Sequence, residues 1–464
     1  MKYTKNGVED IKIAYIGGGS RAWAWILMSD LAKADDICGD VYLYDIDYEA
    51  AKHNEVIGEL YNGAEGAKSH WNYKAVKTID EALTGADFVF ISILPGTFEE
   101  MSSDVHTPEK YGIYQSVGDT AGPGGIVRSL RTIPMIEEIA KAIEKNCPDA
   151  WVINYTNPMT VIVRTLYRVF PKIKAFGCCH EVFGTQRLLV SMLKDEYGYE
   201  DDIKREDIKV DVVGVNHFTW ITGAYYKGTD LFPLYREFAK KYAKTGFTKG
   251  KDDNWFNNFF DSAQRVKFDL FNRYGYMAAA GDRHLAEFSD GEWYLKNPET
   301  VKEWKFGLTP VQWRKDDLKK RLQKSEDMRS GKEKVVLGAT GEDGVNQVRA
   351  ILGLHEMICN VNMPNRGQIP NLPNDVVVET NATFRSGNVV PVAAGNLPNE
   401  IYGLIARAVA NQEVVVEAGL TRDLELAFNA FINDPLVTLD IDDARALYNE
   451  MIDNTKKYLG EYFK

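Results

Sequence analysis

The chain has 464 residues, of which 45% are hydrophobic and 26% charged, and its formal net charge is −12. A chain of this length exceeds what one hydrophobic core usually serves, so we expect two lobes. The acidic balance argues against nucleic acid or an anionic membrane as a partner, and no run of about 18 apolar residues suggests a membrane span. Its five scattered cysteines do not resemble a secreted disulfide framework, so we expect a cytoplasmic protein.

The first 200 residues alternate short apolar runs with amphipathic stretches. The runs predicted as strands are Ile11–Ile16, Asp40–Asp45, Phe88–Leu94, Trp151–Tyr155 and Ile173–Cys179. The helices predicted between them are Ala22–Lys33, Tyr48–Leu60, Leu130–Lys145 and Met159–Val169. Apolar strands that alternate with helices are typical of a doubly wound parallel sheet in the α/β class. We therefore predict a Rossmann-like domain over residues 1–200.

Residues 201–464 have a mixed pattern and are predicted as a second, α+β lobe for substrate binding and oligomerisation. Its clearest helical patterns are Glu400–Glu417, Arg422–Ile432 and Asp443–Tyr458. A charged stretch, Lys315–Lys334, is predicted as either a solvated helix or a disordered excursion. Because no flexible linker is evident, we expect the second lobe to pack continuously on the first.

A glycine-rich turn, Gly17-Gly18-Gly19-Ser20, follows the first predicted strand and opens a helix. Its glycines permit a tight turn and let backbone N–H groups approach a pyrophosphate at the helix N-terminus. Asp45 ends the next strand, where a carboxylate can accept hydrogen bonds from a ribose 2′-OH. The pattern predicts NAD rather than its 2′-phosphorylated form. The alternative is a turn that only packs.

Two further strand ends are predicted to carry ligand contacts. Pro95 follows the strand Phe88–Leu94, and Asn154 and Asn157 lie at the end of Trp151–Tyr155. Ligands of doubly wound sheets bind at the carboxyl ends of the strands, so we expect Pro95 and Asn154 to contact the cofactor. The amide of Asn157 can both donate and accept, which suits a sugar hydroxyl. The alternative is that the Asn-Pro pair forms only a turn.

Cys179 and His217 each lie at or just after the end of an apolar run. A thiolate and an imidazole are ligands for borderline divalent metals, and two protein ligands leave positions open for catalysis. Their spacing is not diagnostic, and each alone is more simply a core residue. Together with the cofactor turn they predict a metal next to a nicotinamide.

Two polar segments complete the candidate site. Val117–Gly125 is too glycine-rich for a regular element and too polar for core, so it is predicted as a loop close to a ligand, or else as a plain surface loop. Arg273–Phe288 is dense in titratable groups, one of which can serve as a general base. The alternative for that segment is a polar surface loop.

Motifs along nearly the whole chain resemble those of glycoside hydrolase family 4. They are GGGS after the first strand, GPGG before SLRTIP, INYTNP, CCHEVFG, VGVNHF and NRGQIPNLPNDVVVE, in this order. Lactate and malate dehydrogenases share single motifs and are relatives in fold, but they do not share the set. The family is an NAD-dependent exception to two-carboxylate glycosidase chemistry. One departure is the segment Glu99–Asp104, where relatives often carry an Arg and an acidic pair.

The resemblance implies a hydrolysis assisted by NAD and a divalent metal, typically Mn²⁺. Hydride leaves carbon 3 of the sugar, a base removes the proton on carbon 2, the glycosidic group is eliminated, and water and hydride return. Cys179 and His217 would hold the metal, and His180 would take the place of the acid that protonates the leaving oxygen.

The same resemblance implies the remaining site residues. Asp119 and Asn157 would contact the sugar. The base would be Tyr276, slightly favoured, or Asp282.

The residues after the site cysteine indicate the substrate. Members that cleave phosphorylated sugars carry Asp or Asn in place of His180, and Cys-His-Glu-Val resembles the motif of α-galacturonidases. The galacturonate carboxylate would be met by Arg283 or His284, unless either is paired with Glu287.

The alternatives are an α-galactosidase, α-glucosidase or α-glucuronidase of the family, a 2-hydroxy-acid dehydrogenase, and a non-catalytic NAD-binding regulator. Family members are usually dimers or tetramers, so a homodimer or homotetramer is expected.

Overall fold

A computed structural model describes residues 1–248, 260–338 and 341–464. Its central feature is the predicted parallel sheet, in the order β4-β3-β2-β5-β6-β7. The strands are β2 (Val8–Ile16), β3 (Ile37–Tyr44), β4 (Trp71–Val76), β5 (Phe88–Ile91), β6 (Trp151–Asn154) and β7 (Lys174–Gly177). This order reverses direction between β2 and β5, which is where doubly wound sheets bind ligands. The sequence prediction missed only β4 among these strands.

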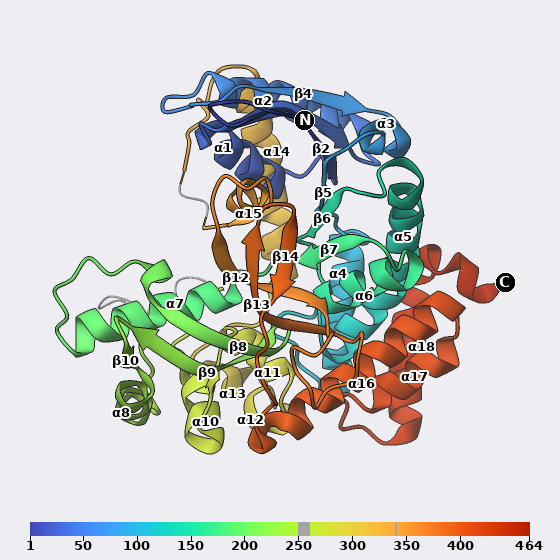
Figure 1. Ribbon diagram of the computed structural model, residues 1–464. Coiled ribbons are helices and arrows are strands. Elements are labelled where there is room, and N and C mark those ends of the chain that lie inside the picture. Colours follow the sequence, from blue (N-terminus) through green and yellow to red (C-terminus); the bar gives the residue numbers. More distant parts are fainter. Residues whose placement is uncertain (249–259, 339–340) are drawn as a thin grey trace.

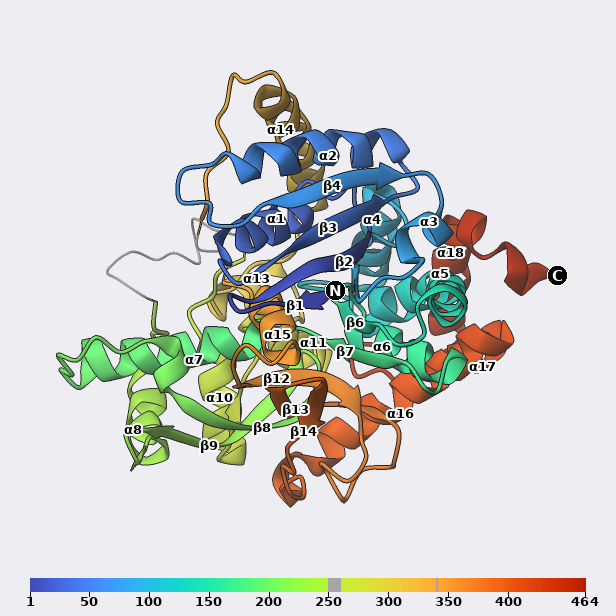
Figure 2. The ribbon, with the colours of Figure 1, turned by 45° about the horizontal axis from the view of Figure 1, so that its top comes forward.

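Helices cover both faces of this sheet (Figure 2). One apolar cluster joins it to α1 (Trp23–Lys33), α2 (Tyr48–Asn62) and α15 (Gly344–Ile351). The other joins it to α3 (Ile79–Leu83), α5 (Gly122–Asn146) and α6 (Met159–Val169). The α/β class predicted from the alternating pattern is therefore confirmed, as are four helices of the first 200 residues to within a few residues at most ends.

The start of α5 differs from the prediction. Gly122–Gly125, expected in an irregular loop, form the first turn of the helix and are buried. The turn is held by side chains that cap its N–H groups, since Gly122 donates to Asp434 Oδ2 (3.0 Å) and Gly124 to Gln115 Oε1 (3.0 Å). A Cβ at Gly125 would lie 2.4 Å from the carbonyl carbon of Thr120, so close backbone packing requires glycine there.

The sheet continues into residues far beyond 200. β12 (Met357–Pro364) pairs with β7 at Asn362↔Gly177, and β13 (Val377–Arg385) and β14 (Asn388–Pro391) follow, all antiparallel. The short strand β1 (Lys2–Tyr3) pairs antiparallel with the first residues of β2. The predicted division at residue 200 therefore does not separate the first sheet from the later chain, because β7 would otherwise be an exposed edge.

The later chain also builds a second sheet, of β8 (Lys209–Val215), β9 (Phe218–Tyr226), β10 (Thr229–Asp230) and β11 (Met277–Ala278) (Figure 1). Around it lie α7 (Glu181–Ser191), α8 (Phe232–Tyr242), α10 (Arg265–Tyr274), α11 (Asp282–Glu287), α12 (Gly291–Tyr294) and α13 (Pro298–Glu303).

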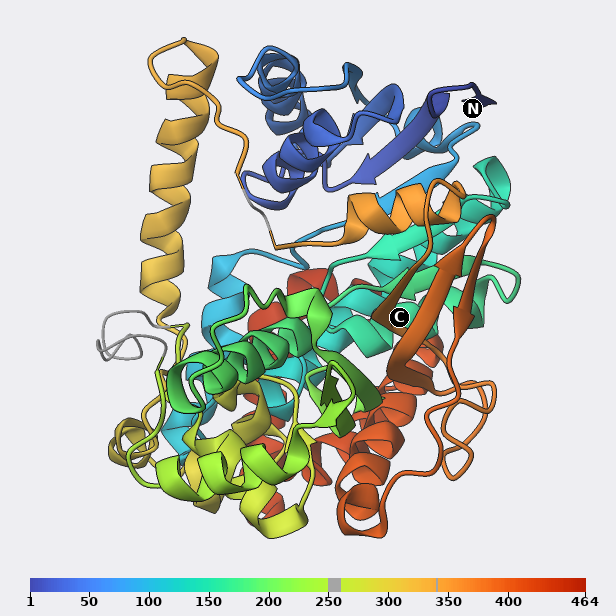
Figure 3. The same ribbon diagram turned by 60° about the vertical axis from the view of Figure 1, so that its left-hand side comes forward.

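The last three helices, α16 (Asn399–Thr421), α17 (Leu424–Ile432) and α18 (Ile441–Thr455), pack on α5. The charged stretch forms a helix, α14 (Val311–Arg329), which contacts α2 and α4 (Phe98–His106) and is exposed along much of its length (Figure 3). None of the helices in the described part of the chain combines the length and apolar composition that crossing a bilayer requires.

Candidate functional site

The glycine turn lies between β2 and α1. Gly17 has a φ of 96°, and a Cβ there would lie 2.0 Å from the Ser92 carbonyl oxygen, so the position requires glycine. The N–H groups of Gly17 and Gly18 both donate to the Tyr44 carbonyl, and Ser20 N–H donates back to Gly17. The turn therefore holds the N-terminus of α1 at the carboxyl end of β2, where a phosphate can be bound.

Asn54 of α2 supports this turn from the core side. Its Nδ2 donates to the carbonyls of Gly18 (2.7 Å) and Ser20 (2.9 Å), and its Oδ1 accepts from Trp25 Nε1 (2.8 Å). The side chain is fully buried. The sequence reasoning missed Asn54, whose only signal was an amide on the inner face of a predicted helix.

Asp45 follows β3 and orders its own loop. Its Oδ2 accepts from Gly19 N–H (2.9 Å) and its Oδ1 from Asp47 N–H (2.9 Å). Burial raises the pKa of Asp45, and these two hydrogen bonds oppose that rise. The carboxylate lies directly beside the glycine turn, as the predicted ribose contact requires.

Two predicted cofactor residues have structural tasks in the loops that bear them. The Pro95 carbonyl accepts from Arg131 Nε (2.9 Å), and Arg131 forms a buried ion pair with Asp104. The Asn154 amide donates to the Thr156 carbonyl (2.9 Å) and accepts from Thr156 N–H (3.1 Å). The Asn154 side chain is therefore turned back on its own loop, and its contact with the cofactor stays a prediction.

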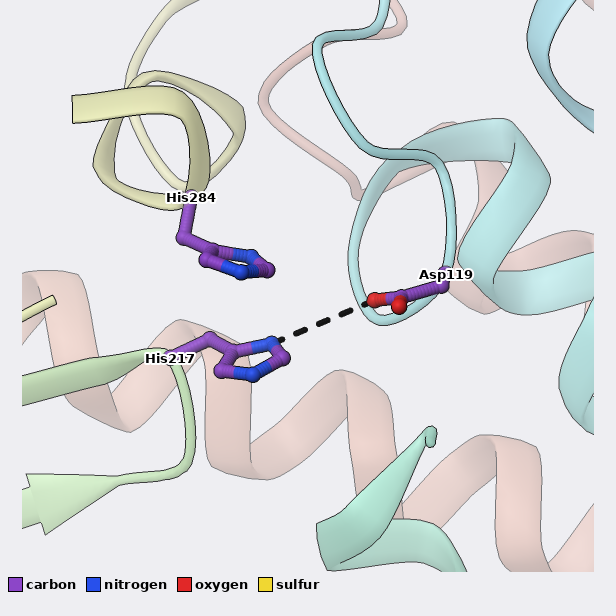
Figure 4. Close-up of side chains that lie close together, drawn as sticks. All are labelled: Asp119, His217 and His284. Atoms are coloured by element: carbon purple, nitrogen blue, oxygen red, sulfur yellow. Dashed lines mark ion pairs between the residues drawn. The ribbon is translucent and has the colours of Figure 1, made fainter. Parts of the chain in front are cut away.

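The side chains of Asp119, His217 and His284 come together from three separate segments of the chain (Figure 4). One potential ligand atom of each lies within 4.8 Å of the others, the only group of three such residues in the described ranges. The rings of His217 and His284 stack with centroids 3.6 Å apart, and His217 Nδ1 lies 3.9 Å from Asp119 Oδ1. The sequence placed these residues in three separate motifs, and only the tertiary structure joins them.

Each residue of the cluster is positioned by a different element. His217 occupies the two-residue turn between β8 and β9 and has a left-handed φ of 63°. Such a conformation is uncommon for residues other than glycine and is maintained where the surroundings fix it. His284 lies on α11, and Glu287 of the same helix accepts from the N–H groups of Val117 (2.7 Å) and Gly118 (2.9 Å). Through these bonds α11 also holds the loop that bears Asp119.

Hydrogen bonds fix the tautomer of His217. Thr120 Oγ1 donates its single hydrogen to Asp119 Oδ1 (2.7 Å) and lies 2.9 Å from His217 Nδ1. The hydroxyl oxygen therefore accepts from Nδ1–H. The lone pair of the neutral ring then lies on Nε2, the arrangement that metal-binding histidines commonly adopt.

Electrostatics keep the two histidines neutral and the aspartate charged. Burial and the neighbouring His284 lower the pKa of His217 to about 3, and burial likewise lowers that of His284. Burial alone would raise the pKa of Asp119, but His217, His284 and Arg128 hold it at about 2. Two neutral imidazoles beside a carboxylate are a donor set suited to a divalent metal.

Cys179, one of the two predicted metal ligands, is outside this group of three. It lies two residues after β7, its carbonyl accepts from Asn360 Nδ2 (3.1 Å), and its thiol is buried beside Asn216, the residue before His217. Burial raises the pKa of the Cys179 thiol, and Glu379 and Glu181 raise it further. The structure thus places the cysteine next to the histidine turn and adds Asp119 and His284 as neighbours of His217.

His180 immediately precedes α7 and is partly exposed. Its Nδ1 lies 2.9 Å from Glu342 Oε1, a hydrogen bond that raises the pKa of His180, and its ring faces Trp23 of α1 at 6.4 Å. The next residue, Glu181, is half-buried, accepts from Gly281 N–H (2.6 Å) and lies 3.7 Å from His284 Nε2. Sequence reasoning assigned no role to Glu181 or Glu342, although Glu181 stands in the CCHEV motif.

Neither residue expected as a base faces the cluster. Tyr276 precedes β11, whose pairing of Met277 with Ile221 puts it about five residues along β9 from His217, roughly 16 Å. There it lines a separate surface pocket with Thr222, Tyr225 and Arg236. This corrects the preference for Tyr276.

Asp282 begins α11, but its Oδ1 accepts from Lys267 N–H (3.1 Å) of α10. Burial raises the pKa of Asp282 to about 6, against the opposing charge of Lys267. Side chains two residues apart on a helix point to different faces, so Asp282 faces α10 while His284 faces the cluster.

The remaining residues predicted to bind substrate differ in how many of their polar atoms already have hydrogen-bond partners in the protein. Asn157 Nδ2 donates to Asp119 Oδ2 (3.2 Å), while its Oδ1 is buried without a partner among the described residues. Arg283 instead donates to the carbonyls of Gly307 and Ser116 and to the Thr309 hydroxyl. Arg283 thus clamps three groups of its own surroundings, and the contact of Arg283 or His284 with the substrate carboxylate stays a prediction.

Comparison with known proteins identifies relatives along the chain. The model of the family 4 glycosyl hydrolases matches residues 12–195, and the model of the family 4 glycosyl hydrolase C-terminal domain matches residues 212–437. An α-galacturonidase of Thermoanaerobacterium saccharolyticum is 61% identical over 459 residues, which cover 99% of this chain and 98% of that protein.

Solved structures agree. The crystal structure of a Bacillus subtilis protein described as the glucosidase lplD has a TM-score of 0.91 at 53% identity, over 96% of this chain and all of that one. A 6-phospho-β-glucosidase from Thermotoga maritima, solved with manganese, NAD⁺ and glucose-6-phosphate, has a TM-score of 0.75 at 23% identity, over 97% of this chain and 99% of that one. The second likeness is one of fold.

Proposed function

Because the chain belongs to family 4 of the glycosyl hydrolases, we propose that it is an α-galacturonidase that works with NAD and a divalent metal. The observation that carries the proposal is the cluster of Asp119, His217 and His284 beside a sheet that has the NAD-type turn. The relative that is 61% identical over 99% of the chain supports the substrate, a uronic acid glycoside. The related α-galactosidase and α-glucosidase activities are the alternatives.

The residues at the site fit both a divalent metal ion and NAD. His217 offers a neutral Nε2, His284 Nδ1 is buried without a partner among the described residues, and Asp119 adds a carboxylate. When bound, a divalent ion such as Mn²⁺ supplies a Lewis acid and NAD supplies a hydride acceptor. We assign the metal to His217 with Cys179, and to Asp119 and His284 as further ligands or ligand supports. The turn at Gly17–Ser20, with Asp45, is the proposed NAD site.

Other side chains act on the sugar. Asn157 Oδ1 is a buried acceptor without a partner in the described structure, suited to a sugar hydroxyl, and its Nδ2 already holds Asp119. Glu342 accepts from His180 Nδ1 and so orients the ring, whose Nε2 is proposed to face the leaving oxygen.

The test is hydrolysis of p-nitrophenyl α-glycosides of galacturonic acid, glucuronic acid, galactose and glucose, with NAD⁺, Mn²⁺ and reductant added or omitted. We expect release from the galacturonide that requires both NAD⁺ and metal. Activity confined to a neutral sugar would contradict the substrate, and turnover that ignores NAD⁺ and metal would contradict the mechanism.

A pair of histidine variants makes the test specific to the cluster. His217→Ala should lower kcat/KM more than about 100-fold and weaken Mn²⁺ binding, because it removes a direct ligand. His70→Ala is the matched control, since His70 is exposed on the first lobe. Equal activity of the two variants would remove His217 from the metal site.

We also propose a compartment and an oligomeric state for the enzyme. All five cysteines are free, as expected in the reducing cytoplasm, which is where we place the enzyme. We propose a homodimer or homotetramer, as is usual for the family, and light scattering with size-exclusion chromatography measures it directly.

A further inference from the structure

Three arginines surround the Asp119 cluster from three elements. Arg128 lies on α5, Arg283 on α11 and Arg314 in the first turn of α14. Burial lowers the pKa of each, and Asp119 opposes that change in each, which puts all three within electrostatic reach of this carboxylate. Within the described residues, none of the three has a carboxylate oxygen within 4 Å, although the chain as a whole carries a charge of −12.

The three differ in how much of the guanidinium group is already engaged. Arg283 donates to the Gly307 and Ser116 carbonyls and to the Thr309 hydroxyl. Arg128 is buried and donates from Nε to the Asn157 carbonyl (3.1 Å). Arg314 Nε is buried with no hydrogen-bond partner in the described part of the chain. A desolvated donor without an acceptor is costly, so Arg314 Nε is a donor that an oxygen atom of a ligand can satisfy.

Ring packing fixes where the Arg314 head group lies. The guanidinium carbons of Arg283 and Arg314 lie 5.1 and 5.2 Å from the centroid of the same Phe260 ring. Lys315, the next residue, pairs with Glu99 at the start of α4 and so holds the first turn of α14 on the first lobe. The guanidinium group of Arg314 is therefore held in place at the beginning of α14, on the side of the cluster that α14 approaches.

The position of Arg314 in its helix is unfavourable by itself. A cation in the first turn lies at the positive end of the helix dipole, which disfavours it unless an anion is nearby. A guanidinium also offers two parallel N–H groups that match a carboxylate. A galacturonide carries one carboxylate, on carbon 5 of the ring, which must be neutralised inside a chain of negative net charge.

We propose that Arg314 binds the carboxylate of the uronic acid substrate and so determines the preference for a charged over a neutral sugar. Arg128 and Arg283 form the positive surroundings, with Arg128 Nε committed to the Asn157 carbonyl and Arg283 Nε and Nη2 committed to the Gly307 and Ser116 carbonyls. This assignment rests on the proposed α-galacturonidase activity and names the group in the site that selects the substrate.

The kinetic test compares p-nitrophenyl α-galacturonide with its methyl ester, the same sugar without the charge. Arg314→Met should lower kcat/KM for the acid by about 30-fold or more, mostly through KM, and change that for the ester by no more than about threefold. The kcat/KM of Arg314→Lys for the acid should lie between those of the wild type and Arg314→Met, since lysine keeps the positive charge but lacks the two parallel N–H groups. The matched control is Arg321→Met on the same helix, where Arg321 pairs with Asp317.

A binding measurement separates failure of this assignment from failure of the proposed function. Calorimetry with D-galacturonate and D-galactose, in the presence of NAD⁺ and Mn²⁺, gives the preference of the wild type and of both variants even if none of them turns over a glycoside. Arg314→Met should remove the preference for galacturonate, and Arg321→Met should keep it. Equal losses on acid and ester, an unchanged preference in Arg314→Met, or a preference lost only in Arg128→Met would overturn the assignment.

Discussion

Individual side chains in the site differ from their usual ionisation because they are buried and paired with neighbours. Glu287 illustrates this. Its Oε1 accepts two backbone N–H groups from the loop that bears Asp119, while its Oε2 is buried without a partner among the described residues. Burial raises the pKa of Glu287 from 4.5 to about 8, and Asp119 contributes to the rise. The carboxyl group is thus protonated in the native protein at neutral pH.

This shift makes stability depend on pH in a defined direction. Between pH 4.5 and about 8 the unfolded state has lost a proton that the native state keeps, so stability falls as pH rises. Glu287→Gln removes the titrating proton, so the free energy of unfolding of the variant should not show this fall. The difference in unfolding free energy between variant and wild type should therefore be more favourable to the variant at pH 8 than at pH 4.5, by on the order of 5 kcal/mol at most at about 1.4 kcal/mol per pKa unit.

Urea unfolding of the wild type and of Glu287→Gln at both pH values measures the difference. If the free energies of unfolding of the wild type and the variant differ by the same amount at pH 4.5 and pH 8, Glu287 is not protonated in the native state.

Helix packing determines how the site loops are held. α5 supplies the Asp119 loop at its N-terminus and is packed by α16 along its length. The close approach depends on Gly419, where a Cβ would lie 2.2 Å from Ile133 Cδ1. Gly403, on the same helix, has nothing within 4 Å of a Cβ position. One helix thus contains a glycine required by packing and a glycine that packing does not require.

This difference predicts opposite effects of the same substitution. Gly419→Ala should destabilise by about 1–3 kcal/mol through overpacking against Ile133. Gly403→Ala should stabilise by about 0.5–1 kcal/mol because alanine is the better helix former. Denaturant unfolding of both variants gives the two values. Stabilisation by both would mean that α16 and α5 can separate at no cost.

On the scale of the whole molecule, the two lobes are interdependent. β12, β13 and β14 extend the first sheet beyond β7, and α15 packs in the same apolar cluster as α1 and α2. The cluster around the second sheet and the late helices also contains residues of α5. Neither half of the chain therefore has a complete core of its own.

A fragment that ends at residue 200 tests this dependence. It retains the six parallel strands but exposes the edge of β7 and the apolar surface that Val345, Val348 and Val361 cover. We expect it to aggregate or to show no cooperative unfolding transition. A soluble fragment with a sharp urea transition would support an independent domain over residues 1–200.

The sequence by itself determined the parallel sheet, the glycine turn and the separate motifs of the site, because these depend on local patterns of apolar residues and glycines. Helices such as Met159–Val169 were predicted to the residue. Only the tertiary structure decided that Asp119, His217 and His284 form the cluster, that Tyr276 and Asp282 face elsewhere, and that β12–β14 complete the first sheet. The physical reason is that metal and substrate sites depend on distances between side chains far apart in sequence. Strand register and helix packing fix those distances, and local patterns do not encode them.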